Sequence, residues 1–156
     1  MCLIALSVEK ASDWNGKDSY FFKVIANRDE YHARQTTKMH WWSNKLILAG
    51  KDEEAGGTWL GTNRNGKFAA ITNLKEQNQI NYKSSRGALV TDFLESKQSA
   101  KGYLKQIEPI KDEFAGFNLI VGDKDGLFYL CNRLEGIYFI SEGTHALGNL
   151  TLNSST

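Results

Sequence analysis

The sequence predicts an α+β fold, built as one domain over residues 1–156. Strand-like segments come first, two amphipathic helical segments follow, and strand-like segments then return, so strands and helices are segregated rather than alternating. A length of 156 residues suits one domain, and a hydrophobic fraction of 41% is enough for a core. The chain has a single proline, Pro109, and no low-complexity run, so no interdomain linker is predicted.

The amino-terminal segments predict an antiparallel hairpin. Residues 2–8 and 20–26 are strand-like, and the polar stretch between them is typical of a turn. A register that places Val8 near Tyr20 would bring the Cys2 thiol beside the residues that follow the second strand.

A second group of strands is predicted next. Residues 46–49, 58–63 and 67–73 have the composition of strands, and Asn65-Gly66 is a turn signal between the last two. The last two of these segments predict a second hairpin.

Two helices and three further strands complete the predicted fold. Apolar residues recur at helical spacing over residues 85–95 and 100–107, and Pro109 should end the second helix. The strands are expected at residues 117–121, 127–131 and 137–140, with Asp125-Gly126 as a hairpin turn. The polar tail ends without a closing element, so we expect a domain truncated at its carboxy terminus.

Composition excludes several classes of protein. Nineteen Lys plus Arg against eighteen Asp plus Glu give a net charge of +1, which predicts no nucleic acid partner. Apolar runs are far shorter than the roughly 18 residues of a membrane span, so no transmembrane segment is expected. Charged residues directly follow the first apolar run, unlike in a signal peptide. Two cysteines, Cys2 and Cys131, are interpreted as thiols of a cytoplasmic protein, and organelle association stays open if the source is eukaryotic.

Cys2 is the candidate nucleophile. Removal of Met1 would expose a thiol and an α-amine on one residue, with reference pKa values of about 8.5 and about 7.7–8.0. Arg28 beside it would lower the thiol pKa, and Asp29 could hydrogen-bond the amine or orient the arginine. Taken alone, a cysteine that opens an apolar strand is more typical of core packing. Residues 27–30, taken alone, are more typical of a turn with an exposed ion pair.

Ordered motifs along the whole chain change that balance. They are Met1-Cys2-Leu3-Ile4, Asn27-Arg28-Asp29-Glu30, Gly56-Gly57-Thr58-Trp59-Leu60-Gly61, the run from Asn65 to Asn73, Ser85-Arg86-Gly87, the strand from Gly116 to Asp123, and the segment from Gly143 to Asn149. Together they resemble the NRDE-motif family of transport and Golgi organisation proteins.

That family is in turn similar to the N-terminal-nucleophile (Ntn) hydrolases of the choloylglycine hydrolase and penicillin V acylase type. The resemblance implies a four-layer αββα sandwich, of which this chain would be an incomplete portion. It assigns Cys2 as nucleophile and base, Asp29 as the partner of the amine, and Arg28 as a nearby guanidinium, although the hydrolases place their arginine three residues before the aspartate. Asn73 matches the oxyanion-hole asparagine, and Asn149 is the candidate for a second site asparagine.

Several candidates have structural alternatives. Asn73 could cap a strand end, and Trp59, the candidate ligand-binding side chain, could pack in the core. Gly56-Gly57 lacks the spacing of a nucleotide-binding loop. The three histidines, His32, His40 and His145, have no metal-ligand spacing, so no metal site is predicted.

Two functions remain as hypotheses. The first is an amidohydrolase in which Cys2 attacks an unknown small-molecule amide without a cofactor. The alternative is a noncatalytic haem or acyl-lipid carrier, because the family resemblance implies links to haem trafficking and lipid metabolism, and a cysteine thiolate can ligate haem iron. A purely structural role is the third possibility.

Overall fold

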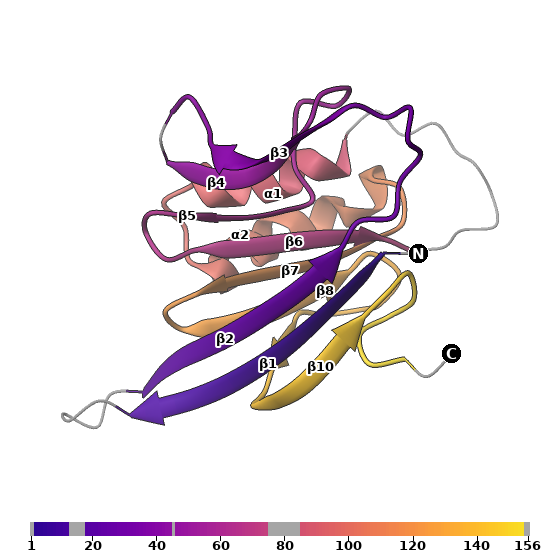
Figure 1. Ribbon diagram of the computed structural model, residues 1–156. Coiled ribbons are helices and arrows are strands. Elements are labelled where there is room, and N and C mark those ends of the chain that lie inside the picture. Colours follow the sequence, from indigo (N-terminus) through magenta and orange to yellow (C-terminus); the bar gives the residue numbers. More distant parts are fainter. Residues whose placement is uncertain (1, 13–17, 45, 75–84, 155–156) are drawn as a thin grey trace.

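The computed structural model describes residues 2–12, 18–44, 46–74 and 85–154. Within these ranges the chain forms a three-stranded sheet and a seven-stranded sheet, both antiparallel. The helices and the small sheet lie on opposite sides of the large sheet (Figure 1).

The small sheet has the order β10-β1-β2 and contains the predicted amino-terminal hairpin. Its strands are β1 (Leu3–Ser12), β2 (Asp18–Asn27) and β10 (Gly143–Leu147). The predicted register is wrong by two residues, because Val8 pairs with Phe22 and Tyr20 pairs with Lys10. A shift of two keeps every side chain on its predicted face, since the side-chain period of a strand is two. The hydrophobic pattern therefore determined the faces without determining the register.

The large sheet has the order β3-β4-β5-β6-β7-β8-β9. Its strands are β3 (Thr36–Trp41), β4 (Ile47–Asp52), β5 (Leu60–Asn63), β6 (Phe68–Asn73), β7 (Phe117–Asp123), β8 (Gly126–Cys131) and β9 (Tyr138–Ile140). The six strands predicted in this part of the chain are confirmed with shifted ends. β3 was not predicted, because all of its side chains are exposed and no alternation marks it.

The two predicted helices are α1 (Arg86–Glu95) and α2 (Ala100–Ile107). As predicted, α2 ends before Pro109, and a 3-10 helix, η1 (Glu108–Glu113), follows it. Lys67, just before β6, donates from Nζ to the Phe93 carbonyl at 3.2 Å and to the Ser96 carbonyl at 2.7 Å, which satisfies carbonyls at the end of α1. Within the described ranges, neither helix has the length and apolar character needed to cross a membrane.

Two apolar cores separate three layers. One lies between the sheets and contains the inward face of β1, formed by Ile4, Leu6 and Val8. The other lies between the large sheet and the helices and contains Phe93 and Leu104. The α+β class is confirmed. The described residues supply a helix layer and two sheet layers, and the second helix layer of the expected αββα sandwich is not among them.

Candidate functional site

A cavity of about 320 Å³ lies where the start of β1, the ends of β2 and β6, and the start of α1 converge. Cys2, Arg28, Trp59 and Asn73, four of the residues predicted to form a site, line its wall. The start of β1 lies beside the end of β6 (Figure 1), so residues far apart in the sequence meet at one edge of the two sheets.

The Cys2 thiol lies against the backbone of the NRDE segment, as the hairpin predicts. The Asp29 N–H donates to Cys2 Sγ at 3.4 Å, and the thiol lies 3.7 Å from the Asp29 carbonyl oxygen, to which it can donate. Burial raises the pKa of the Cys2 thiol above its ordinary value. The amino terminus and Arg28 lower this pKa and Glu30 raises it, and the net shift is upward. The guanidinium thus acts on the thiol in the predicted direction but does not outweigh burial.

Asn149 joins the amino terminus of β1 to the end of β6. Its Oδ1 accepts a hydrogen bond from the Cys2 N–H at 3.1 Å, and its Nδ2 donates to the Asn73 carbonyl oxygen at 2.7 Å. The Asn73 side chain itself is exposed and lines the cavity. Two candidate asparagines therefore lie together with Cys2, and one of them contacts the nitrogen that would become the α-amine.

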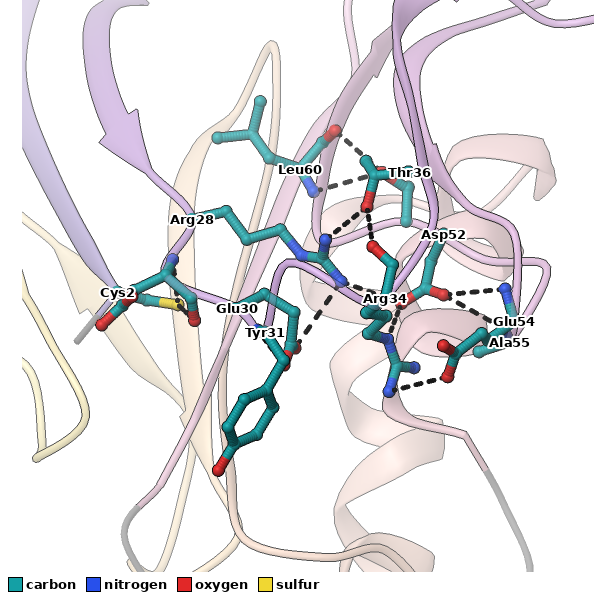
Figure 2. Close-up of polar contacts among 12 residues, drawn as sticks. Cys2, Arg28, Glu30, Tyr31, Arg34, Thr36, Asp52, Glu54, Ala55 and Leu60 are labelled. Atoms are coloured by element: carbon teal, nitrogen blue, oxygen red, sulfur yellow. Dashed lines mark hydrogen bonds and ion pairs between the residues drawn. The ribbon is translucent and has the colours of Figure 1, made fainter.

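The Arg28 guanidinium is held by the carboxylate of Asp52, which was not among the predicted site residues (Figure 2). Arg28 Nη2 lies 3.0 Å from Asp52 Oδ2 and 3.6 Å from Glu30 Oε2, and Nη1 donates to Thr36 Oγ1 at 2.6 Å. Asp52 Oδ2 also accepts from Arg34 Nε at 2.7 Å. Arg28 and Arg34 therefore share one carboxylate oxygen at the end of β4.

Asp52 also organises the turn that follows it. Its Oδ1 accepts from the N–H groups of Glu54 and Ala55 at 3.1 and 3.2 Å. Burial alone would raise the Asp52 pKa, but the hydrogen bond from Arg34 and those from the two backbone donors outweigh burial and hold the pKa below its usual value. Asp52 stands in the charged run Lys51-Asp52-Glu53-Glu54, which has the composition of a solvated turn, so only its contacts reveal its place in the site.

Trp59 is half-buried, and its ring supports the Arg28 guanidinium. The guanidinium carbon lies 4.4 Å from the ring centroid, within cation-π range. The indole also packs against the core beneath the helices. Trp59 thus combines the predicted cavity position with the core packing that was its structural alternative.

A metal site finds no support in the described part of the chain, where no three or more His, Cys, Asp and Glu side chains are grouped to hold an ion. His145 instead bonds locally: its Nε2 contacts the Ser141 carbonyl oxygen at 2.8 Å and its Nδ1 contacts Asn153 Nδ2 at 3.0 Å. The cavity wall itself presents a thiol, amides and charged side chains.

Comparison with known proteins gives a consistent family. The family model for Transport and Golgi organisation 2 matches residues 1–156. The mouse Transport and Golgi organization 2 homolog is 36% identical over 148 residues, which are 88% of this chain and 54% of the mouse protein. The human homolog is 37% identical over 149 residues, with the same shares of each chain. An uncharacterized protein of Saccharomyces cerevisiae is 38% identical over 82 residues, 48% of this chain and 26% of the yeast protein.

The chain spans about half the length of the mammalian relatives that it matches. The family match extends over every motif that marked the resemblance, from Met1-Cys2 to Asn149. The chain therefore belongs to the Transport and Golgi organisation 2 family.

Proposed function

We propose that this protein is an amidohydrolase whose nucleophile is Cys2, acting after removal of Met1. The observation that carries the proposal is the pair of contacts made by the Asn149 side chain. It accepts from the Cys2 N–H and donates to the carbonyl oxygen of Asn73, which lines the cavity at the end of β6. A thiol, an α-amine and an amide donor would then meet at one cavity, as nucleophilic catalysis on an amide requires.

In the acylation step, the Cys2 α-amine takes the proton of the Cys2 thiol. The thiolate attacks the amide carbonyl carbon, a C–S bond forms, and the carbonyl electron pair moves onto oxygen. Asn73 lines the cavity, and its side-chain amide would donate to that oxyanion, a contact worth about 2.7–4 kcal/mol in comparable sites. When the intermediate collapses, the C–N bond breaks and the α-ammonium returns its proton to the leaving amine.

Deacylation reverses these roles with water. The α-amine takes a proton from water, hydroxide adds to the thioester carbonyl, and the C–S bond breaks. The departing sulfur regains a proton from the α-ammonium, and the carboxylic acid is released. Asn149 would orient the amine throughout, because its Oδ1 accepts the Cys2 N–H.

In the proposed mechanism the Arg28 side chain forms part of the cavity wall. Its two terminal nitrogens already contact Thr36 and Asp52, and its face rests on Trp59. The adjoining wall includes apolar residues of β1, β5 and β6, namely Ile4, Leu60 and Ile71. We infer that the substrate amide carries an apolar group, because a cavity with such a wall gains free energy by covering apolar surface.

A noncatalytic carrier is the second candidate, and one observation favours it. Burial raises the pKa of the Cys2 thiol, which opposes formation of the thiolate that both attack and metal ligation need. For a carrier, the same shift disfavours ligation of haem iron by Cys2 and so favours an acyl lipid. The cavity volume, about 320 Å³, is at the small end of the range for ligand pockets, so the size of the cavity also disfavours a ligand as large as haem.

Hydrolysis of a panel of N-acyl amides by the full-length protein tests the two candidates. The amidohydrolase predicts turnover that is lost in Cys2→Ala and retained in Cys131→Ala, since Cys131 is a buried thiol of β8 outside the cavity. Saturable acyl-lipid binding that survives Cys2→Ala, without turnover of any amide, would replace the amidohydrolase by the carrier.

A further inference from the structure

A buried chain of hydrogen bonds leads from the space between the two sheets to residues 148–152, the segment that contains Asn149. Tyr129 donates from its hydroxyl to Asn118 Oδ1 at 2.7 Å, and Asn118 Nδ2 donates to Thr72 Oγ1 at 3.2 Å. Thr72 in turn donates to the Gly148 carbonyl oxygen at 2.8 Å. The three side chains are 2%, 0% and 3% exposed, so water does not compete for these contacts.

The same cluster holds the segment at two further points. Asn118 Nδ2 also donates to the Leu150 carbonyl oxygen at 2.8 Å, and the Leu152 N–H donates to the Tyr129 hydroxyl at 3.3 Å. The Asn118 amide thereby uses both of its N–H groups, and the Tyr129 hydroxyl both donates and accepts. Each donor therefore has one defined acceptor, which fixes the orientation of the cluster.

The segment needs this support because it lies beyond the sheet. β10 ends at Leu147, so residues 148–152 pair with no strand in the described part of the chain. The carbonyls on both sides of Asn149, those of Gly148 and Leu150, are held by Thr72 and Asn118. These two side chains face each other across β6 and β7, where Thr72 pairs with Asn118.

We propose that Thr72 is a positioning residue that, together with Asn118, holds Asn149 in contact with Cys2 and Asn73. The proposal rests on the proposed function of Cys2 and Asn149. Two consecutive residues of β6 bind the segment, since the Thr72 hydroxyl fixes the Gly148 carbonyl and the Asn73 carbonyl accepts from the Asn149 side chain. The polar cluster thus links the large sheet, through Asn149, to the nitrogen of Cys2.

Thr72→Val tests the proposal, because valine keeps the size and β-branching of threonine and removes only the hydroxyl. Thr62→Val is the matched control. The Thr62 hydroxyl also donates to a backbone carbonyl, that of Lys67, at 2.7 Å, but it lies in the β5–β6 hairpin outside the cavity. Thr72→Ser, which keeps the hydroxyl, should restore most of the wild-type behaviour.

The first readout is the rate of Cys2 alkylation as a function of pH, with the modified peptide identified by mass spectrometry. The charged groups that act on this thiol are the amino terminus, Glu30 and Arg28. After removal of Met1, loss of the Asn149 acceptor destabilises the charged Cys2 ammonium beside the thiol, so the pKa of the thiol should rise and the alkylation profile should move to higher pH. We expect this shift in Thr72→Val and Asn149→Ala, no shift in Thr62→Val, and no added shift in the Thr72→Val/Asn149→Ala double variant. In protein that lacks Met1, a wild-type profile in Thr72→Val, or full additivity, would overturn the proposal.

The second readout does not depend on a free α-amine. Hydrogen exchange of the backbone amides at residues 148–152 should accelerate by about fivefold in Thr72→Val, the factor that corresponds to one lost hydrogen bond, and stay at the wild-type rate in Thr62→Val. If the intact mass shows that Met1 is retained, the proposed catalysis fails while this comparison still decides the positioning role. Equal exchange in Thr72→Val and wild type would refute it.

Discussion

The Asp52 carboxylate lies 3.0 Å from the Arg28 guanidinium and holds it in place in the wall of the cavity. Because Arg34 Nε contacts the same oxygen at 2.7 Å, one carboxylate charge is shared between two guanidinium groups. The NRDE motif is therefore connected to the end of β4 through Asp52, and the Arg28 side chain is directed toward that carboxylate while its backbone neighbour Asp29 contacts the thiol.

Replacement of Asp52 by asparagine should destabilise the fold. The two arginines would lose their shared charged acceptor, while hydrogen bonds to charged groups contribute about 1.5–3 kcal/mol each to stability. We expect a decrease of about 2–3 kcal/mol in the free energy of unfolding, measured by urea denaturation at neutral pH. Glu53→Gln, at an exposed neighbour, is the control and should change it by less than about 0.5 kcal/mol. An equal effect of the two substitutions would contradict the role of Asp52.

Acid should weaken the fold partly through the same carboxylate. The Asp52 pKa is lowered in the folded protein, so its contribution is complete above the unfolded-state value of about 3.9 and is lost as the pH falls through the folded-state pKa. The free energy of unfolding, measured from pH 6 downward, should therefore fall less steeply below about pH 4 in Asp52→Asn than in wild type. Parallel acid profiles would show that Asp52 does not titrate with unfolding.

Glu30 should oppose activation of the Cys2 thiol. Burial is the main cause of the raised thiol pKa, and the Glu30 charge adds to it. Glu30→Gln should move the pH profile of Cys2 alkylation to lower pH. Glu54→Gln removes a carboxylate that pairs with Arg34 and should leave the profile in place. A shift of the same size in both variants would point to a general loss of negative charge.

Asn73→Ala should impair turnover without impairing the fold. Its side chain is exposed at the end of β6, so truncation leaves no buried gap. If its amide stabilises the oxyanion, kcat for an amide substrate should fall by about 100- to 1000-fold, while the melting temperature stays close to that of wild type. Asn65→Ala, in the exposed turn before β6, is the control for loss of an asparagine amide. Unchanged kcat in Asn73→Ala would remove Asn73 from the mechanism.

Local patterns were sufficient to predict most of the elements. The two helices, the β7–β8 hairpin and the amino-terminal hairpin follow from hydrophobic periodicity and turn residues. β3 escaped prediction because it is an edge strand whose side chains are all exposed, and β10 because only Leu147 of its five residues is buried. Neither strand carries the alternation by which a half-buried strand is recognised.

The site was only partly predictable for a different reason. Cys2 and Asp29 could be brought together by one hairpin, but Asp52 meets Arg28 only through the pairing of β3 with β4. Thr72 and Gly148 are 76 residues apart, and nothing local in either residue indicates their contact. Side-chain contacts over such separations depend on how the sheets assemble, which single-sequence patterns do not encode.

The proposed role of Cys2 is tested by the intact mass of the full-length protein purified from cells, before and after treatment with a reagent that captures 1,2-aminothiols. We expect a chain without Met1 that gains one adduct at Cys2, whereas Cys2→Ser gains none. A wild-type chain that retains Met1 and gains no adduct would contradict that role, because no free α-amine would then exist to act as the base for the Cys2 thiol.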